Sequence, residues 1–291
     1  MTEKKVARNT TIKYRLYPTP TQAALIDKTF GCCRWLWNAI LADEQEFFAA
    51  TGEHFLPTPA RYKQEAQFLK EADSQALVTV HQNLRRAFND FFDGKSGYPQ
   101  FKPKYSRDAY TTYCHHYDYC PDSIRIEGEG IVLPKVKWVR AKLHRKPLHW
   151  WTLKSATVSK SKDGKYYCSL LFGFEEQPPE PIKPKNIGTV QASELPEYIR
   201  KAEQKLDAME QAFWRMQPGS KNYEQQQRRI ARQREHIANQ KCDYAHKETK
   251  RLADAYDAVE AGTADTRFRE KLRYKLERQG KRLLEDERSG H

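Results

Sequence analysis

A run of short strand-like segments between residues 110 and 174 is the feature that most constrains the fold of this chain. Turn sequences such as EGEG and KDGK separate the segments, and Asp163-Gly164 is a strong hairpin signal. Together with an earlier alternating segment at Thr10–Tyr17, they predict a small β-barrel. The strands expected in the run are Tyr110–Tyr113, Ser123–Ile126, Gly130–Leu133, Trp138–Leu143, Lys154–Lys160 and Lys165–Phe174.

A helix-rich stretch at residues 19–94 separates the first strand from the others. Thr21 is a suitable cap for a first helix, whose apolar residues recur at helical spacing. Gly31 interrupts that helix, and we interpret it as a place where another backbone approaches closely. Two further helices are predicted at Ala60–Glu71 and Ser74–Phe92. The helical part is therefore an insert within the barrel.

The second half of the chain begins after a proline-rich run that is typical of a linker. The sequences NIGTV and AVEAG can each form one strand, and between them two long helices predict a helical hairpin. A last helix is expected at Thr266–Glu285. The predicted organisation is a first barrel strand at 1–18, a helical recognition insert at 19–94, the rest of the barrel at 95–177, a linker at 178–186 and a C-terminal domain at 187–291.

The charge of the chain points to a polyanionic partner. Lys and Arg number 51 against 38 Asp and Glu, which gives a formal net charge of +13. Between Lys95 and Lys165 there are 15 basic and 6 acidic residues, with aromatic residues between them. Nucleic acid is favoured over an anionic membrane, although a solvated sheet with core aromatics gives the same composition. No apolar stretch is long enough to cross a bilayer and no signal sequence is evident, so we expect a cytoplasmic, nucleoid-associated protein.

Several side chains are candidates for contacts with phosphates or bases. Gln82, Asn83 and Arg86 fall outside the apolar stripe of their helix, and amides and guanidinium groups read base edges. Tyr98 is as suited to the core as to stacking on a base. The predicted RNA- and DNA-binding residues are Lys13, Arg15, Arg34, Asn38, Gln82, Asn83, Arg86, Tyr98, Lys102, Lys104, Arg145, Lys146, Lys160, Lys162, Lys221, Arg228, Arg229 and Arg232.

The six cysteines contain no CxxC pair, so a zinc ribbon is not expected. Cys114, His115, His116 and Cys120 could bind a metal if they folded together. Their spacing fits no standard site, and no metal site is predicted.

Motifs along most of the chain resemble those of one family. They are YRLYPTPTQAALIDKTFGCCRWLWNAIL, RRAFNDFF followed by GYPQFKPKY, LPKVKWVRAKLHR with DGKYYCSL, and SKNYEQQQRRIARQREHIANQKCDYAHK. On these motifs the chain resembles TnpB, the transposon-encoded RNA-guided DNA nuclease related to type V CRISPR effectors. The resemblance implies an α+β, multidomain protein, with a wedge-like β-barrel, an inserted helical recognition bundle and a reduced RuvC-like domain dominated by a helical hairpin.

The same resemblance implies partners and an activity. A guide RNA and a double-stranded target DNA with a short adjacent motif are the expected partners, with base pairing reading most of the target. Whether a homodimer sits on one RNA stays open. A protein that binds its own transposon-like RNA without a DNA target is a further alternative.

The nuclease half departs from the pattern that the resemblance implies. TnpB-like nucleases hold two divalent metals with three carboxylates. Val190 stands at the position of the first, Glu260 is a vestige of the second, and the sequence ends at His291 with neither the third nor a zinc ribbon. One isolated carboxylate cannot hold two Mg²⁺ ions. We therefore expect no catalytic residue and neither catalytic magnesium nor zinc.

The expected function is RNA-guided DNA binding that represses transcription, similar to nuclease-dead TnpB-like repressors. On this interpretation the chain is not an enzyme. The alternative is a truncated or internally deleted RNA-guided DNA endonuclease of the same class.

Overall fold

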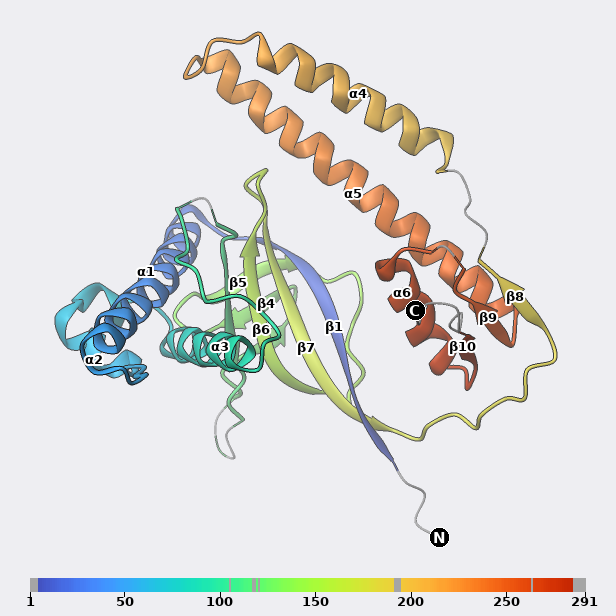
Figure 1. Cartoon of the computed structure of the whole chain (residues 1–291), viewed down its shortest axis with the longest axis horizontal. Coiled ribbons are helices and arrows are strands. Elements are labelled where there is room, and N and C mark those ends of the chain that lie inside the picture. The colour runs from blue at the N-terminus through green and yellow to red at the C-terminus, as the bar shows by residue number, and fades with distance from the viewer. Residues whose placement is uncertain are drawn as a thin grey trace. The chain divides into compact units, whose positions relative to one another are not determined.

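The computed structural model describes residues 5–104, 106–116, 119, 121–190, 195–262 and 264–284. The chain divides into two compact units (Figure 1). The larger unit is Ala7–Phe174, and the smaller unit comprises Met1–Val6 and Glu175–His291. None of the described helices is both long enough and apolar enough to pass through a bilayer.

The larger unit is built on a seven-stranded sheet in the order β2-β6-β7-β1-β5-β4-β3 (Figure 1). The pairs β2–β6, β6–β7, β1–β5, β5–β4 and β4–β3 are all antiparallel. The strands are β1 Val6–Tyr17, β2 Ala109–Tyr113, β3 Arg125–Glu127, β4 Gly130–Leu133, β5 Lys137–Lys142, β6 Thr152–Lys160 and β7 Tyr166–Glu176.

The sheet is open, so the predicted closed barrel is wrong. Its edge strands β2 and β3 contain five and three residues and do not pair with each other in the described part of the chain. Between them, the Ser123 amide donates to the His115 carbonyl at 3.0 Å. Alternation and strand number predict a curved sheet, whereas closure also depends on strand tilt and stagger.

The helices that follow β1 are α1 Pro20–Thr51, α2 Pro59–Glu65, the 3₁₀ helix η1 Gln67–Lys70 and α3 Ser74–Phe92. Thr19, and not Thr21, caps α1. Its hydroxyl accepts from the Gln22 amide at 3.3 Å, and the Gln22 side chain accepts from the Thr19 amide at 3.0 Å. The helix runs through Gly31, where a Cβ would meet nothing within 4 Å, so the expected close approach is not found.

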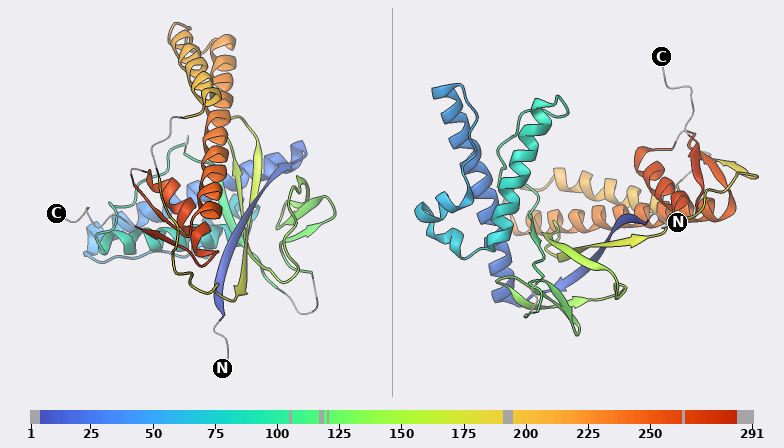
Figure 2. Two further views of the ribbon diagram at one scale, coloured as in Figure 1. Left: turned by 90° about the vertical axis from the view of Figure 1, so that its right-hand side faces the viewer. Right: turned by 90° about the horizontal axis from the view of Figure 1, so that it is seen from below.

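Helices α1 and α3 lie side by side and pack against β2 (Figure 2). Leu36 and Ile40 of α1 and Leu77 and Leu84 of α3 are completely buried. Burying a side chain of this size stabilises the fold by about 1.5–3 kcal/mol. The apolar stripes at helical spacing therefore hold the insert on the sheet.

Glu44 of α1 is a buried carboxylate and is only 1% exposed. A buried charge is tolerated only with hydrogen-bond partners, and here the Tyr98 hydroxyl donates at 2.6 Å while the His54 ring contacts the other oxygen. Burial and the hydrogen bond to Glu44 raise the pKa of Tyr98 to about 12. Tyr98 packs edge-on against Phe88 and Phe91, so it has a structural role in the insert.

The smaller unit combines a helical hairpin with a three-stranded parallel sheet (Figure 1). The hairpin consists of α4 Glu197–Trp214 and α5 Lys221–Ala255. Central strand β9 Ala258–Glu260 pairs with β8 Ile187–Thr189 and with β10 Arg282–Leu284. Leu252 of α5 packs with Val259 and with the buried leucines of α6 Thr266–Glu277.

The last helix is shorter than predicted, and strand β10 was missed. Helix α6 ends at Glu277, and the Lys281 amide donates back to the Leu276 carbonyl at 2.9 Å. Gly280 adopts φ +71°, and a Cβ there would lie 2.2 Å from the Glu180 carbonyl oxygen. Such a left-handed glycine commonly ends a helix, and here it turns the chain into β10.

Candidate nucleic-acid interface

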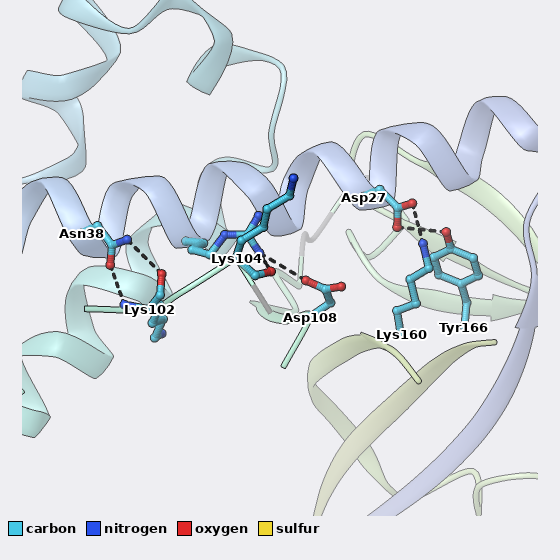
Figure 3. A network of polar contacts seen from close by, with 8 residues as sticks. Asp27, Asn38, Lys102, Lys104, Asp108, Lys160 and Tyr166 are labelled. Carbon is cyan, nitrogen blue, oxygen red and sulfur yellow. Dashed lines mark hydrogen bonds and ion pairs between the residues drawn. The ribbon is translucent and has the colours of Figure 1, made fainter. Parts of the chain in front are cut away.

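The basic segment at residues 97–108 is fastened to α1 by side chains (Figure 3). The Asn38 amide donates to the Lys102 carbonyl at 3.0 Å and accepts from the Lys102 amide at 2.8 Å. Arg34 donates to the Lys104 carbonyl at 3.3 Å and lies 3.4 Å from the Asp108 carboxylate. Arg34 and Asn38 were predicted to contact nucleic acid, and in the structure their polar atoms bind this segment.

Helices α1 and α3 and the segment at residues 102–111 enclose a hollow of ≈ 380 Å³. Phe30, Val80 and Tyr110 provide apolar lining, while Asn83 and Arg107 are exposed polar residues of the same hollow. The structure thus brings Asn83 of α3 together with the basic segment, although they are distant in sequence. Arg107 was not among the predicted nucleic-acid-binding residues. Its position shortly after Lys102 and Lys104, in a basic run of the sequence, could have indicated it.

The exposed face of α3 beside this hollow carries Gln82, Asn83 and Arg86. Within the described ranges, none of these three side chains has a hydrogen-bond or ion-pair partner. Residues three and four apart share a helix face, so the three polar groups form one patch. We call Gln82, Asn83 and Arg86 the α3 patch.

Lys102 lies at the edge of the hollow with its ammonium group 3.6 Å from the centre of the Trp37 ring. Burial lowers the pKa of Lys102. The ring face partly compensates for lost water, because a cation is attracted to the aromatic face. Lys104 is exposed, and only its backbone takes part in the contacts with α1 (Figure 3).

A second set of polar contacts fastens α1 to the β6–β7 hairpin (Figure 3). The Asp27 carboxylate accepts from Lys160 at 2.7 Å and from the Tyr166 hydroxyl at 2.9 Å. Burial acts to lower the pKa of Lys160, but the hydrogen bonds with Asp27 and Tyr166 outweigh it and raise the pKa. Lys160 was predicted to bind nucleic acid, whereas its ammonium group is part of this ion pair.

Three basic side chains of the larger unit lie over aromatic rings. Lys13 lies 4.3 Å from the ring centre of Tyr167, and the Arg15 guanidinium lies 5.2 Å from that of Tyr17. The Arg145 guanidinium lies 5.5 Å from the ring centre of Trp151. Such pairs combine a charge for phosphate with a face for a base. Lys13, Arg145, Lys146 and Lys162 are exposed, so the structure leaves these predicted residues accessible.

The smaller unit has a basic stripe along α5. Lys221, Arg228, Arg229 and Arg232 are exposed and line one shallow hollow of ≈ 380 Å³. We call these four residues the α5 stripe. Nearby Arg234 is different, because it forms an ion pair with Glu210 of α4 at 2.8 Å.

Glu260 lies on the central strand of the small sheet. Its carboxylate accepts from the Thr189 hydroxyl at 3.0 Å, and its carbonyl accepts from the Val190 amide at 3.0 Å. Gly188 allows the Tyr256 ring to pack closely, because a Cβ would lie 2.5 Å from that ring. Gln191, which follows Val190, lies outside the described residues.

The described residues near Glu260 do not match the ligand set of a two-metal nuclease. Such a site needs several convergent carboxylates. In the described ranges, a group of three or more convergent His, Cys, Asp or Glu side chains occurs only at Cys114, His116 and Asp122, in the larger unit. Among the described residues, Glu260 therefore lacks the partner carboxylates of a two-metal site.

Comparisons with known proteins identify the family. Residues 8–53 match the OrfB_IS605 family's "Helix-turn-helix domain", and residues 187–267 match the same family's "Probable transposase". The chain is 28% identical over 261 residues to the "Putative RNA-guided DNA endonuclease InsQ" of Escherichia coli (strain K12), covering 81% of this chain and 61% of the relative. It is 27% identical over 266 residues to a "Putative RNA-guided DNA endonuclease" of Streptomyces pristinaespiralis, covering 82% and 63%.

A solved structure has a similar fold. It is entitled "Cryo-EM structure of the Cas12f1-sgRNA-target DNA complex" and matches with a TM-score of 0.52 at 8% identity, covering 97% of this chain and 89% of the other. The two family matches and the named relatives support the resemblance to the TnpB family. The family resemblance expected from the motifs is therefore confirmed.

The prediction that the chain is not an enzyme is contradicted. Both TnpB relatives are named as RNA-guided DNA endonucleases, which are enzymes. The prediction relied partly on motifs missing after the last helix. The chain spans about three fifths of the length of these relatives.

The contacts of Asn38 lead to a first prediction. Asn38→Ala removes both hydrogen bonds to the Lys102 backbone, at an expected cost of about 1–3 kcal/mol. Amide hydrogen exchange should then become about tenfold faster or more at residues 100–104, because 1.4 kcal/mol corresponds to a factor of ten.

Asn89→Ala is the matched control, since Asn89 is exposed and its side chain makes no hydrogen bond within the described residues. Equal exchange at residues 100–104 in the two variants would show that Asn38 does not hold this segment.

Proposed function

We propose that this chain binds a guide RNA and, through base pairing by that RNA, a double-stranded DNA target next to a short motif. The observation that carries the proposal is the α3 patch of unpartnered Gln82, Asn83 and Arg86, which lies beside a hollow lined by Lys102 and Arg107. Support comes from TnpB-family relatives named as RNA-guided endonucleases and from the fold shared with Cas12f1, whose structure contains a guide RNA and target DNA.

The α3 patch is suited to reading the adjacent motif. A helix fits the major groove of DNA, where an arginine can bind guanine and an asparagine or glutamine can bind adenine with two hydrogen bonds. The patch offers one arginine and two amides on one face. Lys104 and Arg107, both exposed nearby, can neutralise the adjoining phosphates.

The remaining exposed lysine and arginine side chains are suited to binding the phosphate backbone of the guide RNA or of its hybrid with DNA. In the larger unit these are Lys13, Arg145, Lys146 and Lys162. In the smaller unit the α5 stripe can follow a strand of phosphates, because its cations recur along a helix of 35 residues. Both surfaces bind by charge, so they carry little sequence specificity.

The bound DNA has two fates under this proposal. The first fate is cleavage, which is the activity given in the names of the relatives. The β8-β9-β10 sheet then corresponds to a reduced RuvC-like domain, in which Glu260 provides one carboxylate. Repression of transcription follows from occupancy alone, because a protein-bound hybrid obstructs a polymerase. Incubating the RNA-loaded protein with matched DNA and Mg²⁺ separates the two, since cleavage leaves cut strands and occupancy leaves retained, intact DNA.

The proposal also implies where the chain acts, and it raises the question of how many copies bind one RNA. A guided DNA-binding protein of a prokaryote works at the nucleoid in the cytoplasm. The mass of the purified complex distinguishes one protein per RNA from a homodimer on one RNA.

A second prediction tests the α3 patch. Arg86→Ala should weaken binding of guide-matched DNA by about 1–3 kcal/mol and reduce discrimination between correct and altered adjacent motifs. Affinity for the guide RNA alone should stay unchanged. Gel-shift titrations with the RNA-loaded protein measure both quantities.

Arg85→Ala is the control for that experiment. Arg85 is a neighbouring, exposed arginine of α3 that lines a different hollow, with Glu44 and His54. Loss of motif discrimination in both variants, or in neither, would contradict motif reading by the α3 patch. Guide-RNA binding in the same variants shows separately whether the proposed RNA partner is correct.

A third prediction concerns the α5 stripe. Arg228→Ala should reduce the slope of log affinity against log salt concentration by about 0.7–0.9, the value for one phosphate contact. Arg234→Ala removes the same charge from the same helix, but Arg234 is paired with Glu210, so the slope should hardly change. Identical slopes for Arg228→Ala and the unaltered protein would show that the stripe does not contact phosphates.

A further inference from the structure

Cys114, His116 and Asp122 come together in the segment that joins β2 to β3. Their sulfur, ring-nitrogen and carboxylate ligand atoms lie within 4.8 Å of one another. Cys114 and Asp122 are partly buried, and His116 is exposed. The sequence suggested a different group, Cys114 with His115, His116 and Cys120, and Cys120 lies outside the described residues.

The contacts of His116 leave one of its ring nitrogens facing the Asp122 carboxylate. Its Nε2 lies 3.0 Å from the Leu153 carbonyl oxygen, which can only accept, so Nε2 carries the hydrogen. In a neutral ring Nδ1 then has a lone pair, and it faces an Asp122 oxygen at 2.9 Å. Two acceptors at that distance repel each other unless a second proton or a metal ion lies between them.

The backbone already holds these groups in place. The Cys114 amide donates to the Lys154 carbonyl at 2.8 Å, which fixes the segment to β6. The His115 amide donates to the Ser123 hydroxyl at 2.8 Å, and the Ser123 amide donates to the His115 carbonyl at 3.0 Å. The Cys114 thiol contacts the Ile124 carbonyl at 3.4 Å. The two ends of the segment therefore present their ligands toward one point.

The donor set matches zinc better than magnesium or calcium. Zn²⁺ binds thiolate, imidazole and carboxylate in tetrahedral sites, whereas Mg²⁺ and Ca²⁺ prefer oxygen ligands. A zinc-bound histidine usually donates its other N–H to a carbonyl or carboxylate, and His116 has that contact with Leu153.

The nitrogen and oxygen ligands need only a small adjustment to admit the ion. A tetrahedral ion with bonds of about 2.1 Å holds nitrogen and oxygen ligands about 3.4 Å apart. The 2.9 Å contact must therefore open by about 0.5 Å, which side chains that are 48% and 38% exposed can accommodate.

We propose that Cys114, His116 and Asp122 bind one Zn²⁺ ion, with water as the fourth ligand. The ion joins the end of β2 to the residues before β3 and fastens both to β6 through Cys114 and His116. This site lies in the larger unit and does not depend on the proposed guided DNA binding. Its function is structural, because it closes the segment between the two edge strands of the sheet.

The test uses the full chain, stripped with a chelator and titrated with Zn²⁺ by calorimetry and with Co²⁺ by absorption spectroscopy. We expect one equivalent of metal and a thiolate-to-cobalt charge-transfer band. The band should disappear in Cys114→Ser. Asp122→Asn should weaken Zn²⁺ binding by about 10–100-fold or more, at least the loss seen when an outer partner of a zinc ligand is removed.

Cys242→Ser is the matched control, because Cys242 is an exposed free cysteine of the smaller unit. It should keep both the band and the affinity, and circular dichroism should confirm that all the variants are folded. Absence of a thiolate–cobalt band, or unchanged Zn²⁺ affinity in Asp122→Asn, would contradict the proposed zinc site.

Discussion

Hydrogen bonds from two side chains of α1 to the backbone of residues 102–104 hold the candidate interface together. Pro103 has no N–H to donate to a strand ladder, so the segment needs other partners. Asn38 supplies a donor and an acceptor to Lys102, and Arg34 donates to the Lys104 carbonyl. Because of these contacts, the basic segment stays at the edge of the hollow between α1 and α3 and is not absorbed into the sheet.

The basic residues consequently fall into two groups with different physical roles. Lys160 and Arg234 are paired with carboxylates and connect neighbouring elements. The α3 patch and the α5 stripe have no such partners in the described residues and are exposed. Exposed cations without partners raise the local positive potential and attract phosphate, so the unpaired group is the one that supports nucleic-acid binding.

The sequence was most informative where structure is local. Helix α3 and strand β4 have the predicted bounds, because their apolar periodicity and flanking turns depend on neighbouring residues. The closed barrel and the last helix failed because closure and the turn at Gly280 depend on distant contacts, such as that with the Glu180 carbonyl. Arg34, Asn38 and Lys160 were predicted as nucleic-acid-binding residues. Their partners in the structure lie more than 60 residues away in the sequence, so no local pattern could predict these contacts.

The central claim is that this chain recognises DNA through an RNA that it carries. The most direct measurement is to purify the protein from its host, sequence the retained RNA, and compare the binding of two DNA duplexes. One duplex matches the 3′ end of that RNA beside the adjacent motif, and the other has the matching region scrambled. The account predicts one discrete RNA species and retention of the matched duplex alone. Recovery of no discrete RNA, or equal retention of both duplexes, would contradict it.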